Sequence, residues 1–213
     1  ACLQNEQAIR WTEDCADRAV TLVKNVDDLL PLSSQKYRKV YLNVLEADDR
    51  MDNPLRLKLK AMLEKEGFSV TVRNRDFNID MGAFMAGRPD ARTLEVIQEI
   101  GAKAADFSNQ YDLAIYVANL QTASNTTVIR LNWKVLGGMG DDAPWFTAEV
   151  PTVFISLANP YHLLDVPMVQ AFVNAYSDND QVLASVMEKL MGRSPFKGQN
   201  PVDPCCGRPD LLW

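Results

Sequence analysis

Strand-like apolar segments alternate with amphipathic helical segments along most of this chain, and this alternation limits the fold more than any other feature. Residues 112–118 are almost continuously apolar, the pattern of a strand covered on both faces. Further segments rich in β-branched and aromatic residues are expected to be strands: 39–45, 68–73, 127–131, 152–157 and 170–175. Strands that alternate with helices predict a mostly parallel sheet between helical layers.

Helical segments separate these strands. Spacings of three and four residues predict an N-terminal helix over about 6–24. Its apolar face is formed by Ala8, Trp11, Cys15, Ala19 and Leu22. A cap at Asn53 starts a second helix that ends at Gly67, and further helices are expected over 91–107 and 177–192, the last opened by a capping box at Ser177.

The remaining segments lack a clear period. Residues 74–90 and 132–150 are expected to be loops, and 193–213 are expected to form an irregular, proline-rich C-terminal tail. We therefore expect one domain over 1–213 with an α/β fold, a three-layer α/β/α sandwich whose mostly parallel sheet has about five or six strands.

Charge and composition exclude several functions. The 213 residues carry a formal net charge of −6 without a basic run, so they have no electrostatic footprint for nucleic acid. No apolar stretch approaches the ~20 residues that a membrane helix needs. There is one histidine, His162, through which any histidine-dependent chemistry of this chain must pass. We expect neither a nucleic-acid partner nor a membrane partner.

The four cysteines do not have the spacing of a zinc or redox site. Cys15 lies on the apolar face of the first predicted helix, which indicates a buried thiol. Free thiols at Cys205 and Cys206 are favoured over a strained vicinal disulfide. We expect no metal and no cofactor, and unpaired cysteines favour the cytoplasm, with export left open.

The loop after the first long predicted strand, residues 46–52, is acidic and has no glycine, which excludes a phosphate-cradling loop there and disfavours a flavodoxin-type cofactor site. Asp48 and Asp49 would suit the Mg²⁺ site of a phospho-receiver domain. That alternative also requires an acceptor aspartate where Asn119 stands, so a solvated loop is favoured. Residues 137–140 are glycine-rich, but Asp141-Asp142 follows them, and they are interpreted as a flexible loop.

Hydrolase signatures are absent from the sequence. It contains no G-x-S-x-G motif, and Ser156 lacks the neighbouring glycine of a strained nucleophile elbow. His162 is either a base or substrate contact, or a structural histidine at the start of a short helix satisfied by backbone groups, and the second reading is favoured. With 28 acidic residues, no single carboxylate pair is indicated as a glycosidase pair.

Several phrases resemble one known family in their order and spacing. They are 19–32 (AVTLVKNVDDLLPL), 150–161 (VPTVFISLANPY), 172–177 (FVNAYS), 195–198 (PFKG) and 201–202 (PV). Together they resemble the C-terminal domain of glycoside hydrolase family 3 enzymes, in the β-N-acetylhexosaminidase (β-N-acetylglucosaminidase) branch. The resemblance covers about residues 16–206. The tail departs from related tails, which carry an aromatic residue where Cys205 stands and a tryptophan near Pro209.

The resemblance implies that catalysis lies outside this chain. In that family a preceding barrel supplies the nucleophilic aspartate, and in the N-acetylglucosaminidase branch a His–Asp acid/base pair also comes from the barrel. The β-glucosidase branch instead takes a glutamate acid/base from this second domain. The acidic residues of the long loop are Asp141, Asp142 and Glu149, and no motif singles one out. We therefore expect no catalytic residue in this chain.

The resemblance also implies partners and a role. The chain begins at Ala1 without an initiator methionine or a signal segment, and we expect a fragment whose parent acts on β-linked N-acetylhexosamine glycosides. The domain in this chain would support the N-terminal catalytic barrel of the same polypeptide and the rim of the sugar site. Asn119, Trp133, Asp141 and Asp142 are the candidates for proximity to carbohydrate at the domain interface, and Trp133 would either stack on a sugar ring or pack at a domain contact. The alternative is a free-standing binding or scaffold α/β domain.

Overall fold

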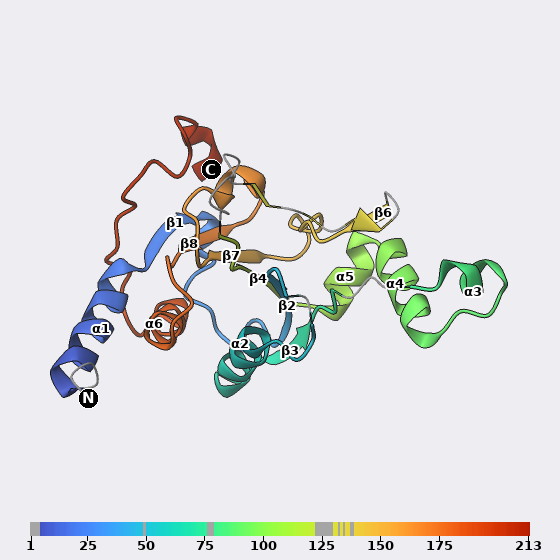
Figure 1. Ribbon diagram of the computed structural model, residues 1–213. Helices are drawn as coiled ribbons and strands as arrows, with labels where there is room; N and C mark the ends of the chain where they lie inside the picture. The colour runs from blue at the N-terminus through green and yellow to red at the C-terminus, as the bar shows by residue number, and fades with distance from the viewer. Residues whose placement is uncertain are drawn as a thin grey trace.

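The computed structural model describes residues 5–48, 50–75, 79–121, 130–131, 133, 135–136 and 139–213. Its central feature is a six-stranded sheet in the order β1-β8-β7-β4-β2-β3 (Figure 1). The strands are β1 (Thr21–Asn25), β2 (Lys39–Leu45), β3 (Ser69–Val72), β4 (Leu113–Ala118), β7 (Thr152–Ser156) and β8 (Ala171–Asn174). Neighbours from β8 to β3 are parallel, and the edge strand β1 runs antiparallel to β8.

Helices cover both faces of the sheet. One face packs against α1 (Glu6–Ala19), α2 (Pro54–Lys65) and α6 (Asp180–Leu190), and the other against α5 (Ala104–Gln110) and the short helices η3 (His162–Asp165) and η4 (Pro209–Leu212). Alternate residues of β2 divide between the two cores: Leu42 and Val44 face the first, and Tyr41 and Leu45 the second. The expected three-layer α/β/α sandwich with a mostly parallel sheet is confirmed.

The smaller elements lie between these layers and at the edges. They are η2 (Val26–Asp28), α3 (Met81–Met85), α4 (Ala91–Gly101), and the hairpin of β5 (Val135–Leu136) and β6 (Met139–Asp141). Helix α4 lies beside α5 at the β3 end of the sheet (Figure 1). Among the described residues, no helix has the length and apolarity needed to cross a membrane.

The expectation of one helix over 6–24 is wrong in its last turn. The helix ends at Ala19, and Thr21–Asn25 is strand β1, because pairing with β8 satisfies backbone groups that the sheet edge would otherwise expose. The expected burial of Cys15 is also wrong, since its side chain is exposed and Ala16 is the buried residue of α1. The free state expected for Cys205 and Cys206 is confirmed.

The segment expected as one helix over 91–107 is two helices. Ala102 is extended, and Asp106 then accepts a hydrogen bond from the backbone N–H of Lys103 at 3.1 Å, which caps α5 as a new start. The expected loop 74–90 contains the helix α3 among its described residues. Asp80 caps it by accepting from the N–H of Ala83 at 2.8 Å.

Two further boundaries differ from expectation. The last helix is capped by Asn179 rather than Ser177, because the Asn179 side chain accepts from the N–H of Val182 at 2.9 Å. The predicted strand 127–131 lies mostly outside the described residues, and its last two residues are not in a strand. The backbone N–H of Leu131 instead donates to Asp165 at 2.8 Å.

Candidate functional site

The chain reverses its direction of travel across the sheet between β2 and β4. From β2 it passes through α2 to β3 on one side, and β4 lies on the other side of β2. The carboxyl ends of β2 and β4 therefore form a topological switch point, where loops diverge and open α/β sheets bind their ligands. Glu46 and Asn119 are the residues that follow these two strands.

Three polar side chains meet at this switch point. The side-chain amide of Asn119 donates to Oε1 of Glu46 at 3.0 Å and to Oδ2 of Asp178 at 3.1 Å. Its backbone N–H donates to the carbonyl of Leu45 at 2.9 Å, which fixes the base of the side chain. Asp178 comes from the turn that follows β8, so three separate loops build the cluster. Asn119 was expected from the sequence, whereas Glu46 and Asp178 were not.

The cluster is a set of hydrogen-bond acceptors held by one amide. Oε2 of Glu46 is buried and has no hydrogen-bond partner among the described residues. Asp178 is exposed, and because carboxylate oxygens can each accept more than one hydrogen bond, it retains capacity for hydroxyl donors. No cluster of histidine, cysteine and carboxylate side chains suited to a metal ion occurs among the described residues. The cluster fits a ligand that carries hydroxyl groups.

The only histidine of the chain is a structural residue. His162 is buried at the start of η3, as expected, but its partner is a side chain rather than the backbone: Nδ1 lies 2.8 Å from Oγ of Ser156. The Ser156 hydroxyl donates its hydrogen to the carbonyl of Asn159, so it accepts a hydrogen bond from Nδ1–H of His162, and in this arrangement the ring is not placed to act as its base. Burial lowers the pKa of His162 to about 4, which keeps the ring neutral.

Asp142 is also a structural residue. Its carboxylate is fully buried and pairs with Nε of Arg73 at 3.0 Å and with Nη2 of Arg75 at 2.8 Å. A carboxylate enclosed by two guanidinium groups is compensated and closed to substrate. Burial and charge pairing hold the Asp142 carboxylate beneath the surface of this chain. Its expected proximity to substrate stays a prediction.

The other loop candidates are Trp133, Asp141 and Glu149. Trp133 is half-buried and packs against the core on the α5 face of the sheet. The backbone of Asp141 ends β6, and its side chain lies outside the described residues. Glu149 is exposed, and its N–H donates to the carbonyl of Phe146 at 3.0 Å. The structure therefore places Asn119 in the cluster and gives Trp133 and Asp142 different surroundings.

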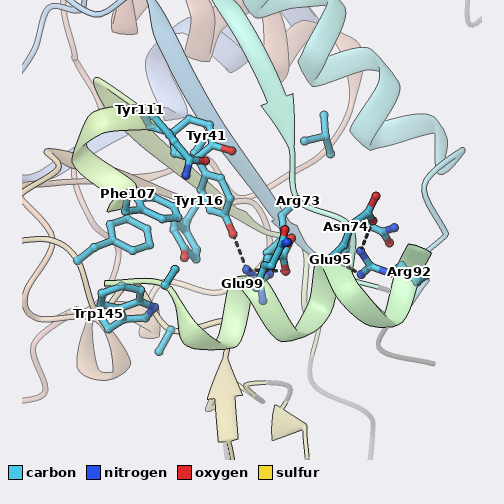
Figure 2. A pocket seen from close by; sticks show the side chains of 16 residues that line it. Tyr41, Arg73, Asn74, Arg92, Glu95, Glu99, Phe107, Tyr111, Tyr116 and Trp145 are labelled. Carbon is cyan, nitrogen blue, oxygen red and sulfur yellow. Dashed lines mark hydrogen bonds and ion pairs between the residues drawn. The ribbon is translucent and has the colours of Figure 1, made fainter. Parts of the chain in front are cut away.

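A cavity of about 630 Å³ lies between the sheet, α4 and α5. Figure 2 shows its labelled aromatic side chains, among them Phe107 and Trp145, gathered at one end and its charged side chains at the other. Arg73 donates to the hydroxyl of Tyr41 at 2.8 Å and lies 3.5 Å from Glu99. Burial raises the pKa of Tyr41 and of Glu99. Sequence reasoning missed this cavity because its walls come from segments far apart in the chain.

No family model matches the chain. It is 37% identical to the β-glucoside phosphorylase BglX, a solved structure that it matches with a TM-score of 0.77 over 98% of this chain and 34% of that one. It is 32% identical over 197 residues to a β-N-acetylglucosaminidase/β-glucosidase of Cellulomonas fimi, covering 92% of this chain and 32% of that protein. The chain is a homologue of glycoside hydrolase family 3 enzymes.

The family resemblance expected from the sequence is confirmed at this level. A family 3 β-N-acetylglucosaminidase from a Paenibacillus species shares the fold, with a TM-score of 0.54 and 16% identity over 95% of this chain and 34% of that one. The chain spans about a third of the length of each of these relatives. The names of these relatives refer to two classes of substrate, β-glucosides and β-N-acetylglucosaminides.

The phrases that carry the family 3 resemblance meet in space. Asn174 of the β8 phrase donates to Oδ1 of Asn200, which lies between the two tail phrases, at 3.0 Å. Gly198 of the tail lies so close to the entry phrase that a Cβ there would overlap Thr21 and the carbonyl of Ala19. These phrases therefore pack together at one edge of the fold, where β1, β8 and the tail meet.

Proposed function

We propose that the chain is the non-catalytic sandwich domain of a family 3-type enzyme that acts on β-linked N-acetylhexosamine glycosides. In this proposal it packs against an N-terminal catalytic barrel of the same polypeptide, and its switch-point edge contributes to the rim of the sugar site. The observation that carries the proposal is the cluster of Glu46, Asn119 and Asp178, found in a homologue that spans about a third of its relatives.

The chemistry of the cluster suits the binding of a sugar rather than its cleavage. The exposed carboxylate of Asp178 offers oxygens that accept hydrogen bonds from sugar hydroxyls, and Asn119 joins it to Glu46. A binding group of this kind lowers the barrier by positioning the substrate against catalytic groups supplied elsewhere. Ser156 and Asp142 could in principle act as a nucleophile or an acid, but both side chains are buried and bonded to other protein groups.

A second candidate substrate class is the β-glucosides. It is favoured by the 37% identity with BglX, which is described as a β-glucoside phosphorylase. The two classes differ at the sugar C2 position, where an N-acetyl group replaces a hydroxyl. The two candidates also differ in the molecule that receives the glycosyl group, which is water in a hydrolase and inorganic phosphate in a phosphorylase.

The experiment that separates these possibilities is an assay of the full-length protein. Chromogenic β-N-acetylglucosaminide and β-glucoside are each supplied with and without inorganic phosphate. The proposal expects kcat/KM to be higher for the N-acetylglucosaminide by about tenfold or more, which equals ~1.4 kcal/mol of transition-state preference. A preference for the glucoside supports the second candidate and overturns the first.

The non-catalytic role is tested on the 213-residue chain itself. The chain alone is expected to release no chromophore from either glycoside. Turnover by the chain that is abolished by substitution of one of its own carboxylates contradicts the role. The rival, a free-standing binding or scaffold domain, is tested by reading the gene upstream of the codon for Ala1. Roughly 250 or more in-frame residues with eight strand–helix units support the enzyme, and a start codon immediately before Ala1 supports the rival.

A further inference from the structure

A second ligand site is indicated by the cavity between α4, α5 and the sheet, about 630 Å³ in volume. This volume falls in the range of about 300–1,000 Å³ that is typical of small-molecule sites. The cavity lies over the face of the sheet that carries Tyr41 and Tyr116, whereas Glu46 and Asn119 follow the carboxyl ends of the same two strands. The two sites are therefore built from different parts of β2 and β4.

The aromatic end of the cavity is a rigid apolar platform. The rings of Phe107 and Phe146 are stacked with centroids 3.8 Å apart. Trp145 packs edge-on against Phe146 at 5.5 Å and against Phe107 at 6.1 Å, yet it remains 46% exposed. An indole that contacts two rings and is partly open to solvent presents a flat surface for an apolar ligand face.

The charges at the other end of the cavity cancel within the protein. Arg73 pairs with Asp142 at 3.0 Å and lies 3.5 Å from Glu99. Arg92 pairs with Glu95 at 3.1 Å and donates to the carbonyl of Asn74 at 3.0 Å. Because each guanidinium already faces a carboxylate, the cavity offers an anion no uncompensated positive charge, and a neutral ligand fits it better.

The polar groups at the rim suit hydroxyl groups. Glu95 and Glu99 lie on one side of α4 with Gln98 between them, and Gln110 ends α5 across the cavity. These side chains are exposed, and their carboxylate and amide groups can accept and donate hydrogen bonds. A ring that is apolar on its face and carries hydroxyls around its edge matches both ends of the cavity.

We propose that this cavity binds a neutral saccharide of one or two rings, with one ring face on Trp145 and its hydroxyls bonded to Gln98 and Glu99. The site goes beyond the proposed function, because it is separate from the switch-point cluster and takes no part in bond cleavage. It gives the chain a carbohydrate contact of its own, independent of any catalytic barrel.

The test is a titration of the 213-residue chain with glucose, N-acetylglucosamine and cellobiose, followed by the ¹H–¹⁵N indole signals of its four tryptophans. The signal that disappears in Trp145→Ala identifies Trp145. We expect this signal to shift saturably with at least one sugar, with a Kd on the order of 1–10 mM. Inorganic phosphate is the anionic probe and is expected to cause no saturable shift.

Matched variants decide the outcome. Trp145→Ala and, separately, Gln98→Ala are expected to weaken binding about tenfold or more. Trp11→Ala, which removes a 68% exposed tryptophan from α1 on the opposite face, is expected to bind as the parent chain does. Gln98 is a surface residue, so that variant tests the site even where Trp145→Ala disturbs folding. Absence of a saturable shift, unchanged binding in Gln98→Ala, or tighter binding of phosphate overturns the proposal.

The outcome is separable from that of the proposed function. Asn119→Ala is expected to leave saccharide binding at this cavity unchanged, because Asn119 is not among its lining residues. Loss of cavity binding in Asn119→Ala contradicts the separation of the two sites. Conversely, a negative titration of the isolated chain says nothing against turnover by the full-length protein, which is measured with chromogenic glycosides.

Discussion

The hydroxyl of Tyr176 donates a hydrogen bond to Oδ1 of Asn200 at 2.8 Å. Tyr176 follows β8 in the unusual left-handed region, with φ of 64°, and Asn200 belongs to the extended tail. This bond joins the sheet edge to a tail that is otherwise irregular. At the same edge Gly198 approaches the backbone of Ala19 so closely that the packing requires glycine at this position.

Gly198→Ala is predicted to destabilise the chain. A Cβ at this position would overlap Oγ1 of Thr21 and the carbonyl oxygen of Ala19. Relief of the second overlap requires the backbone to move, which costs more than a side-chain rotation. Overpacking of this kind costs about 1–3 kcal/mol in the free energy of unfolding. Thermal and urea unfolding of the variant measure the loss. Gly101→Ala is the control, because no heavy atom lies within 4 Å of a Cβ there, and an equal loss in both variants contradicts the close approach.

His162 is predicted to stay neutral well below the usual pKa of histidine. Burial lowers its pKa to about 4 in the folded chain, whereas the unfolded chain has a value near ~6.5. Because it is the only histidine, its imidazole signals in an NMR titration report this residue alone. They are expected to remain unchanged from about pH 8 to about pH 5. A midpoint near ~6.5 contradicts the buried contact with Ser156.

The same shift predicts a loss of stability in acid. A folded pKa below the unfolded value means that the unfolded chain binds the proton first, so stability falls as the pH drops from about 6.5 towards 4. The loss from this residue is at most about 3 kcal/mol. Urea unfolding at a series of pH values measures it for the parent chain and for His162→Gln. The variant is expected to be less stable at neutral pH and to lack this component of the pH dependence.

Asp17→Asn is predicted to destabilise the contact between α1, α6 and the tail. The Asp17 carboxylate accepts from the buried ammonium of Lys189 at 2.6 Å, and this bond holds the pKa of Asp17 well below its usual range. The stabilisation is therefore complete above the unfolded pKa of about 3.9 and is lost as the pH falls below it. The expected cost at neutral pH is about 1–3 kcal/mol in the free energy of unfolding.

The control for Asp17 is Asp14→Asn on the same helix. Asp14 pairs with Arg18 at 3.4 Å, and both side chains are largely exposed. An exposed pair of this kind contributes about 0–1 kcal/mol. The difference between Asp17→Asn and the parent chain should shrink as the pH falls below about 4. A difference that stays constant across this range contradicts an ionised Asp17.

Asp142→Ala is predicted to be among the most destabilising substitutions in the chain. It leaves Arg73 and Arg75, both largely buried, without their shared carboxylate. Removing one partner of a buried ion pair costs about 3–5 kcal/mol in the free energy of unfolding. Glu95→Gln, which breaks the more exposed pair with Arg92, is the control and is expected to cost about 1 kcal/mol or less. Equal stability of the two variants contradicts the structural role of Asp142.

The sequence predicts the centre of this fold better than its edges. Strands such as 113–118 and 152–156 are recognisable because burial on both faces makes them continuously apolar. Strand β1 was interpreted as helix because its apolar residues continue the spacing of α1, and only its partner β8 determines the strand. The end of α4 depends on local hydrogen bonds at Lys103 and Asp106, which periodicity does not reveal.

The candidate site could be predicted only in part, because local patterns reveal strand ends but not which loops meet in space. Asn119 was identifiable because it directly follows a strongly predicted strand. Glu46 also follows a predicted strand, but its acidic neighbours made the loop resemble an ordinary solvated surface. Asp178 joins the cluster only through the parallel order of β2, β4, β7 and β8, a long-range arrangement that no local pattern encodes.

The measurement that tests the central claim most directly is the kcat/KM of the full-length protein carrying Asn119→Ala. Asp112→Asn at the opposite end of β4, where Asp112 accepts from the N–H of Lys39 at 2.7 Å, is the matched control. Because Asn119 positions the carboxylates of Glu46 and Asp178, its loss is expected to lower kcat/KM by about 10–100-fold. The control is expected to retain the parent activity. Equal activity of Asn119→Ala and the parent enzyme would contradict a role for this edge at the sugar site.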